Sequence, residues 1–223
     1  MTLSIRKTMV YLLLIYGGNY LFPLLLLPFP GRVLGVTEFG VLAYCQVVVQ
    51  YLILLTDYRH NLTATRHVWV RRNDPDARSG VYSSTMGAKL ALTLVSFALL
   101  AGGLLFVPGL ASHWPILAAA FGGVIANAAT PLWFFQGMER MKSLALPTFV
   151  SKVACLGFVV LLVKGPGDAA LAALGISIGN VIPAVLALAI IQRNRLVALV
   201  AVPLRLIDES LGEGLRISCR WCW

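Results

Sequence analysis

Charged residues are scarce in this chain. Of its 223 residues only 12% are Asp, Glu, Lys or Arg, whereas 59% are hydrophobic, and the mean hydropathy is +0.83. An ordinary soluble domain carries roughly 25% charged residues, so this chain has too few of them to cover a surface in water. We therefore expect lipid to surround most of the protein.

Among the charged residues, acidic ones are fewer than basic ones. Nine Asp and Glu stand against 18 Lys and Arg, which gives a formal charge of +9. Such an excess of bases is also typical of nucleic-acid-binding proteins. Here, however, the bases lie between long apolar runs, which is the pattern that sets membrane topology. We therefore expect no nucleic-acid partner.

Metal, redox and catalytic motifs are almost missing. Two of the four cysteines, Cys45 and Cys155, fall inside apolar runs, where a thiol packs as a small apolar side chain. Cys219 and Cys222 form a C-x-x-C without the second pair or the histidines that a zinc site needs. No activated serine or nucleotide-binding loop stands out. We expect no metal, no cofactor and no enzymatic activity.

Long apolar segments are what the chain has in abundance. A helix needs about 20 apolar residues to cross a bilayer. The first apolar run is too long for the core of a cleaved signal peptide, so we expect it to be retained. The prediction is an all-α polytopic membrane protein with six transmembrane helices, at approximately residues 8–29, 39–58, 81–107, 115–136, 144–163 and 169–191.

The distribution of Lys and Arg predicts the orientation of these spans. Cytoplasmic connections are enriched in bases. With the amino terminus in the cytoplasm, most of the 18 bases fall on the cytoplasmic side. Arg32 and Lys164 then lie outside, and Lys89 and Lys152 lie within spans.

Prolines occur well inside several predicted spans, at Pro23, Pro131, Pro147 and Pro183, together with pairs of glycines. Proline within a membrane helix frees a backbone carbonyl, and glycine lets helices approach closely. Both features fit ordinary packing of a helix bundle. They also fit bent helices that line a cavity, as in transporters.

The two lysines inside predicted spans are functional candidates, because a charge in the bilayer is costly. Either side chain could instead extend to the headgroups. We find no intramembrane acid to pair with either lysine, and no carboxylate at the membrane centre to carry a proton. We therefore predict that Lys89 and Lys152 face a water-filled interior whose positive charge favours an anionic passenger.

A second polar cluster lies where the second span meets the cytoplasm. If the helix continued, Asp57 and His60 would lie on one side of it, with Arg59 and Arg66 nearby. Arginine is suited to phosphate, so this cluster could hold a lipid pyrophosphate. Topology combined with attraction to anionic lipids is the alternative. Asp57 with His60 could also perform acid–base chemistry, which leaves a membrane enzyme open.

Three stretches are similar to those of one transporter family. They are LPFPGRVLGVTEFGVLAYCQ (residues 27–46), QYLILLTDYRHNLTATR (50–66) and TPLWFFQGMERMKSLA (130–145). Together they resemble the Wzx-type O-antigen and polysaccharide flippases of the multidrug/oligosaccharidyl-lipid/polysaccharide exporter superfamily. The resemblance extends from about Tyr11 to about Glu213, nearly the whole chain.

The resemblance implies one lobe of an all-helical, two-lobe transporter with a central cavity. It implies translocation of undecaprenyl-pyrophosphate-linked oligosaccharide repeat units across the bacterial inner membrane. Membrane lipids, a polysaccharide polymerase and a chain-length regulator are the further partners that it suggests. Lys89 and Lys152, with Arg32 at the outer mouth, would then bind the substrate. A membrane-embedded enzyme of lipid-linked glycan assembly and a small-molecule exporter of the same superfamily are the alternatives.

The chain departs from the family pattern in two places. The family usually has Asp-Tyr-Gly-Phe at the end of the second span, where this chain has Arg59 and His60. The chain also stops after six predicted spans. We expect residues 1–214 to form an amino-terminal lobe and residues 215–223 to be a tail produced by truncation or frameshift. Such a half-chain is expected to be inactive or incomplete in transport.

Within WFFQGMERMK, the residues Trp133, Phe134 and Phe135 are predicted to form an interfacial aromatic belt. Belts of this kind lie at the level of the headgroups. The following residues 136–142 are predicted to form a tight cytoplasmic corner that leads into the fifth span.

Overall fold

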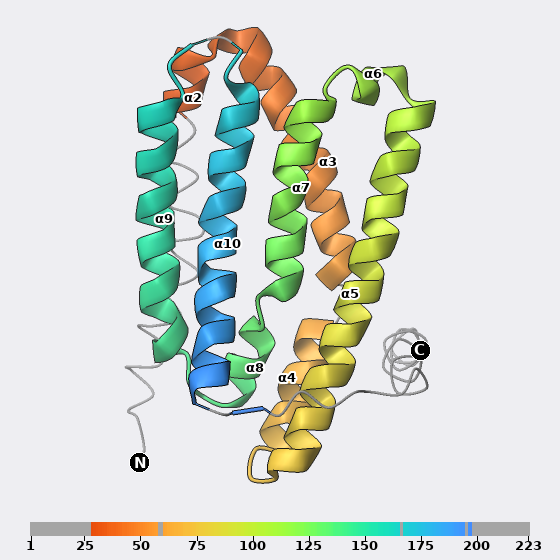
Figure 1. The fold of residues 1–223 in the computed structure, drawn as a ribbon, viewed down its shortest axis with the longest axis vertical. Helices are drawn as coiled ribbons and strands as arrows, with labels where there is room; N and C mark the ends of the chain where they lie inside the picture. Colours follow the sequence, from red (N-terminus) through yellow and green to blue (C-terminus); the bar gives the residue numbers. More distant parts are fainter. Residues whose placement is uncertain (1–27, 58–59, 166, 195, 198–223) are drawn as a thin grey trace, which may run out of the picture.

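The computed structural model describes residues 28–57, 60–165, 167–194 and 196–197. Nearly all of the first predicted span (8–29) and the whole tail (215–223) lie outside the described residues. Within the described ranges the regular structure is α-helical throughout, and the long helices lie side by side in a bundle (Figure 1). The predicted all-α polytopic fold is thereby confirmed.

The described helices follow one another with short connections. They are α2 (Pro28–Val33), α3 (Gly35–Asp57), α4 (His60–Val70), α5 (Pro75–Phe106), α6 (Pro108–Ala111), α7 (Trp114–Ala129), α8 (Leu132–Gly137), α9 (Lys142–Leu162) and α10 (Ala169–Arg193).

Four segments are long and apolar enough to cross a membrane: α3, α5, α7 together with α8, and α10. Helix α9 closely matches the fifth predicted span, 144–163, although its apolar part, Pro147–Leu162, is shorter than the other candidate spans. The structure therefore supports a multi-pass membrane protein, with four such spans among the described residues.

Helix α5 starts six residues before the predicted span. Asp74 caps it by accepting hydrogen bonds from the backbone N–H groups of Asp76 and Ala77 at 3.0 and 3.1 Å. Pro75 occupies the first turn, where its missing N–H has no cost. At 32 residues and about 1.5 Å per residue, α5 is roughly 48 Å long. It therefore extends beyond the hydrocarbon core, which is about 30 Å thick.

The predicted span 115–136 corresponds to the candidate membrane span Trp114–Gly137, but this segment consists of two helices. Helix α7 ends at Ala129, and α8 begins at Leu132. Between them Thr130 is extended, with φ −82° and ψ 109°. The cause is Pro131, which lacks an N–H and disfavours helical conformation in the preceding residue.

The bundle has two distinct ends (Figure 1). Helices α4 and α8 and the turn from α4 to α5 lie at one end, with α2, α6 and the connection from α9 to α10 at the other. The first end carries most of the bases of the described residues, including Arg66, Arg71, Arg72 and Arg78 on α4, the turn and the start of α5. Arg32 and Lys164 belong to the second end.

The three aromatics of WFFQGMERMK lie in the protein interior. Trp133, Phe134 and Phe135 are each 0% exposed. The ring of Tyr82 on α5 lies 5.8 Å from that of Trp133 and 5.5 Å from that of Phe134. The interfacial aromatic belt predicted for these residues is therefore wrong, because their rings lie inside the bundle, where two of them contact Tyr82 of α5, instead of facing headgroups.

Helix α10 packs closely on both of its neighbours. On α7 the hydroxyl of Ser177 donates to the carbonyl of Ala119 at 2.7 Å. On α9, Gly179 has so little space that an added Cβ would lie 2.6 Å from Cβ of Cys155. Gly175, one turn earlier, faces Phe158 and Val159 as closely. The pair Gly175 and Gly179 thus forms the small-xxx-small arrangement that brings membrane helices together.

Gly179→Ala is expected to lower the free energy of unfolding by about 1–3 kcal/mol, because the new methyl overpacks the contact with Cys155. Unfolding of the purified protein in mixed micelles by SDS titration measures this loss. Gly157→Ala on α9 is the control, since no atom lies within 4 Å of its added Cβ. It is expected to be neutral or stabilising by up to about 1 kcal/mol. Equal effects of the two variants would contradict the close packing of α9 and α10.

Candidate functional site

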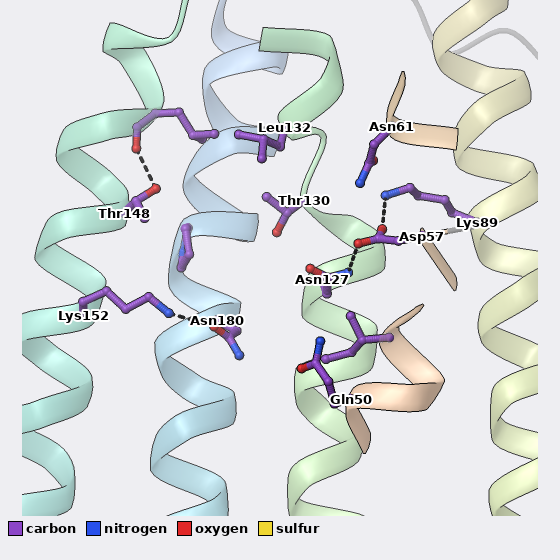
Figure 2. A pocket seen from close by; sticks show the side chains of 13 residues that line it. Gln50, Asp57, Asn61, Lys89, Asn127, Thr130, Leu132, Thr148, Lys152 and Asn180 are labelled. Atoms are coloured by element: carbon purple, nitrogen blue, oxygen red, sulfur yellow. Dashed lines mark hydrogen bonds and ion pairs between the residues drawn. The ribbon is translucent and has the colours of Figure 1, made fainter. Parts of the chain in front are cut away.

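A cavity of about 580 Å³ lies between α3, α5, α7, α9 and α10 (Figure 2). This size is typical of ligand-binding pockets, which span about 300–1,000 Å³. Three charged residues line it, Asp57, Lys89 and Lys152. Four amides also line it: Gln50, Asn61, Asn127 and Asn180. With two bases and one acid, the lining carries one net positive formal charge.

Asp57 and Lys89 form an ion pair on one wall of this cavity. The ammonium Nζ of Lys89 donates to Oδ1 of Asp57 at 2.9 Å. The side-chain amide of Asn127 donates to Oδ2 of the same carboxylate, also at 2.9 Å. The side chain of Lys89 is 2% exposed and that of Asp57 is 26% exposed. Lys89 is therefore desolvated and held by its partner.

Helix α5 places Lys89 deep in the bundle. It lies 14 residues after Pro75 and 17 before Phe106, which corresponds to roughly 21 and 26 Å along the helix. Neighbouring hydroxyls do not compete for the carboxylate, because Thr85 and Thr93 donate to backbone carbonyls of their own helix. The Asp57 carboxylate is thus the group that satisfies the buried ammonium.

Lys152 lies on the opposite wall, in the middle of α9. It is ten residues from each end of this helix, or roughly 15 Å along the axis. Its Nζ donates to Oδ1 of Asn180 on α10 at 3.2 Å. Figure 2 shows this pair across the cavity from Asp57 and Lys89. Lys152 therefore has a neutral amide as its hydrogen-bond partner, whereas Lys89 has a carboxylate.

Asn61, on the first turn of α4, also faces the cavity. Its side-chain oxygen is buried and accepts no hydrogen bond within the described part of the chain. A buried polar atom without a partner costs free energy, so such atoms mark places where a ligand or water can bind. The Asp57 wall thus contains a buried acceptor that has no partner among the described residues.

Residues 5–218 match the family described as "Polysaccharide biosynthesis protein". The chain belongs to this family. The resemblance read from the three sequence stretches is thereby confirmed at the level of the family.

Two curated relatives carry the printed name "Putative O-antigen transporter". The relative from Escherichia coli (strain K12) is 30% identical over 215 residues, covering 96% of this chain and 52% of the relative. The one from Shigella dysenteriae is 29% identical over 209 residues, covering 94% of this chain and 52% of the relative. The chain therefore spans about half the length of the curated relatives it matches. No solved structure matches it significantly.

Two predictions about the intramembrane charges need correction. Lys89 does have an acidic partner, and a carboxylate does lie within the bundle, because Asp57 is both. The prediction placed Asp57 at the headgroups because the second span ends there. In the structure the chain continues into α4, which packs against α5 and α8, so Asp57 remains inside the protein.

The predicted cytoplasmic cluster is divided. Residues 58 and 59, between α3 and α4, lie outside the described residues, so the helical continuation from Asp57 to His60 stays a prediction. Asp57 faces the cavity, whereas Arg66 is exposed on α4. Arg59 and the side chain of His60 lie outside the described residues. The structure thus brings Asp57 together with Lys89 and Asn127, and it does not join Asp57 to Arg66.

Of the three residues predicted to form a cationic lumen, two line one cavity. Lys89 and Lys152 do so, whereas Arg32 is exposed on α2 and is not among the described lining residues. The amides of the cavity were not singled out from the sequence. Their signal was available, because Gln50, Asn127 and Asn180 are uncharged polar residues inside predicted apolar spans.

Proposed function

We propose that this chain is the amino-terminal lobe of a transporter for undecaprenyl-pyrophosphate-linked oligosaccharide repeat units. The passage would take place across the bacterial inner membrane during O-antigen or exopolysaccharide synthesis. The family and the printed names of the two relatives support this proposal. The observation that carries it is a cavity among apolar helices that combines a net positive charge with four amides.

This lining matches both parts of the polar head of such a substrate. Ammonium and amide N–H groups bind phosphate oxygens, and amide oxygens accept hydrogen bonds from sugar hydroxyls. The polyprenyl tail needs no polar site, because it can remain in the surrounding lipid. A net positive lining disfavours cationic drugs, which makes a drug exporter the weaker assignment.

An enzymatic role has less support. The Asp57 carboxylate accepts hydrogen bonds from Lys89 and from Asn127, and no histidine, serine or cysteine accompanies it among the described residues that line the cavity. Among the described residues, no group of three or more His, Cys, Asp or Glu could hold a metal ion. We therefore assign the chain a transport role without catalysis. A polysaccharide polymerase and a chain-length regulator are the protein partners that this role suggests.

We further propose that the end of the bundle formed by α4 and α8 faces the cytoplasm. Its excess of arginines supports this orientation under the positive-inside rule, and it would place the amino terminus on the same side. Because the chain spans about half the length of its relatives, alternating access would require a second lobe. The chain alone is then expected to bind substrate without translocating it.

Substrate binding by the purified chain tests the proposed function. The chain in lipid nanodiscs is expected to bind undecaprenyl-pyrophosphate-linked oligosaccharide at least about tenfold more tightly than undecaprenol, because charged hydrogen bonds add affinity. Retention of radiolabelled lipid by the immobilised nanodiscs measures both affinities. Equal binding of the two lipids would contradict the proposal.

A transport assay complements this measurement. In bacteria that lack their own O-antigen transporter, the chain alone is expected not to restore O-antigen at the cell surface. Surface labelling with an O-antigen antibody reports the result. Restoration by the chain alone would contradict its assignment as an incomplete lobe.

A further inference from the structure

We propose that the cavity is divided, with an anion subsite at Lys152 and Asn180 and a sugar-facing wall at Asn61 and Asp57. This assignment rests on the proposed function and adds the orientation of the substrate's polar head within the cavity. The pyrophosphate would contact α9 and α10, and the first sugars would contact the end of α3 and the start of α4. Lys89, although equally deep, would not bind the phosphate.

Lys89 is unsuited to binding an anion because it already has one. Its ammonium lies 2.9 Å from a carboxylate oxygen, and its side chain is 2% exposed. A phosphate approaching this wall would meet the negative charge of Asp57 as well as the positive charge of Lys89. Binding would require breaking a buried ion pair, which leaves the Asp57 carboxylate without its counter-charge.

Lys152 is better suited than Lys89 to bind an anion, because its hydrogen-bond partner is uncharged. An ammonium group carries three N–H donors, and the structure gives this one a single hydrogen bond, to the neutral amide of Asn180. Among the described lining residues there are two bases and one acid, and that acid is bonded to Lys89, so the surplus positive charge of this part of the lining belongs to Lys152. Lys152 is thus the cation of this cavity that can accept an anionic ligand without losing a salt bridge.

Asn180 completes the donor set. Its side-chain oxygen accepts from Lys152, which leaves the two donors of its NH₂ group for other acceptors. Nδ2 lies beside α7, where a Cβ added at Gly123 would be 3.6 Å away, an ordinary van der Waals distance. An ammonium beside an amide NH₂ is a donor set for two neighbouring phosphate oxygens.

The opposite wall is richer in acceptors. Asn61 presents a buried oxygen without a partner in the described part of the chain, and the partly exposed carboxylate of Asp57 lies on the same wall. Phosphate oxygens are acceptors themselves, so they cannot satisfy the Asn61 oxygen, and the carboxylate of Asp57 repels them. Sugar hydroxyls are donors as well as acceptors and can satisfy Asn61. The two walls therefore select for the two parts of a lipid-linked oligosaccharide.

Binding of undecaprenyl pyrophosphate to the full chain in phosphatidylethanolamine nanodiscs tests the anion subsite. Lys152→Gln is expected to weaken this binding about tenfold or more, because a charge-assisted contact is lost, whereas Lys152→Arg retains most of it. Lys164→Gln is the matched control, since it removes the same charge from an exposed residue at the far end of α9 and leaves binding unchanged. Undecaprenol shows no dependence on residue 152.

The sugar-facing wall is tested by comparing two lipids. Asn61→Leu is expected to weaken binding of the oligosaccharide-linked lipid more than binding of undecaprenyl pyrophosphate. A second measurement does not depend on variants. Undecaprenyl pyrophosphate, and not undecaprenol, should protect Lys152 from an amine-reactive label detected by mass spectrometry, while Lys164 is labelled in both cases.

Failure of this inference is distinguishable from failure of the proposed function. If the unaltered chain binds the oligosaccharide-linked lipid, yet Lys152 is neither protected nor required, the subsite is overturned and the transport role stands. Competition by phosphatidylglycerol as strong as by undecaprenyl pyrophosphate would also overturn it, since the site would then accept any anionic headgroup. If the unaltered chain does not prefer the oligosaccharide-linked lipid to undecaprenol, the proposed function itself fails.

Discussion

Asp57→Ala is expected to lower the free energy of unfolding by about 3–5 kcal/mol, the cost typical of leaving one member of a buried ion pair without its partner. The substitution leaves the ammonium of Lys89 in an environment where its side chain is 2% exposed. It also removes the acceptor for the amide of Asn127. Equilibrium unfolding of the purified protein in mixed micelles, followed by circular dichroism during SDS titration, measures the loss.

The double variant Asp57→Ala/Lys89→Met separates the two contributions to this loss. Because it removes both charges, it is expected to recover most of the stability. Asp76→Ala is the control for removing an acid that makes no such pair, since Asp76 is exposed in the first turn of α5. It should change stability by no more than about 0.5 kcal/mol. Additive effects at Asp57 and Lys89 would show that the pair is not coupled.

The fold was predictable because lipid imposes a simple rule on sequence. Every backbone polar group in the hydrocarbon core must be satisfied within its own segment, so long apolar runs become helices. Helices α3, α5 and α10 accordingly lie where the apolar runs place them. The boundaries were harder to predict, because Asp74 begins α5 early and Pro131 interrupts the fourth predicted span through local backbone chemistry.

The site was only partly predictable. Lys89 and Lys152 could be identified because a charged side chain inside a membrane span is energetically costly and is rarely present without a function. Both do line one cavity. The partner of Lys89 could not be read from the sequence, because Asp57 is 32 residues away and stands at the end of its helix. Only the packing of α4 against α5 and α8 shows that this end remains inside the protein.

Aromatic residues at the end of a span illustrate a second limit of sequence reasoning. Trp and Tyr are enriched both at membrane interfaces and in interiors, so composition does not distinguish the two locations. In this chain the distinction depends on Gly137, which follows the three aromatics. An added Cβ at Gly137 would lie 2.7 Å from Cβ of Val68 and 2.8 Å from the carbonyl of Thr65. Such close approach draws α8 onto α4 and buries the neighbouring rings.

Trp133→Ala is accordingly expected to lower the free energy of unfolding by about 3–5 kcal/mol, the range for truncating a buried aromatic residue to alanine. Its ring is 0% exposed and lies among Tyr82 and Phe134. The loss is one of packing, because the indole N–H makes no hydrogen bond within the described residues. SDS titration in mixed micelles again provides the measurement, and Trp133→Phe, which keeps a ring, should lose less.

Trp114→Ala is the matched control, because it removes the same side chain from the first residue of α7, where it is 61% exposed. A side chain at such a position contributes little to packing, and a change of no more than about 0.5–1 kcal/mol is expected. A belt residue at the headgroups would behave like Trp114, whereas an interior anchor behaves as predicted for Trp133. Similar losses for the two variants would therefore contradict the buried position of α8 and, with it, the packing that keeps Asp57 inside the bundle.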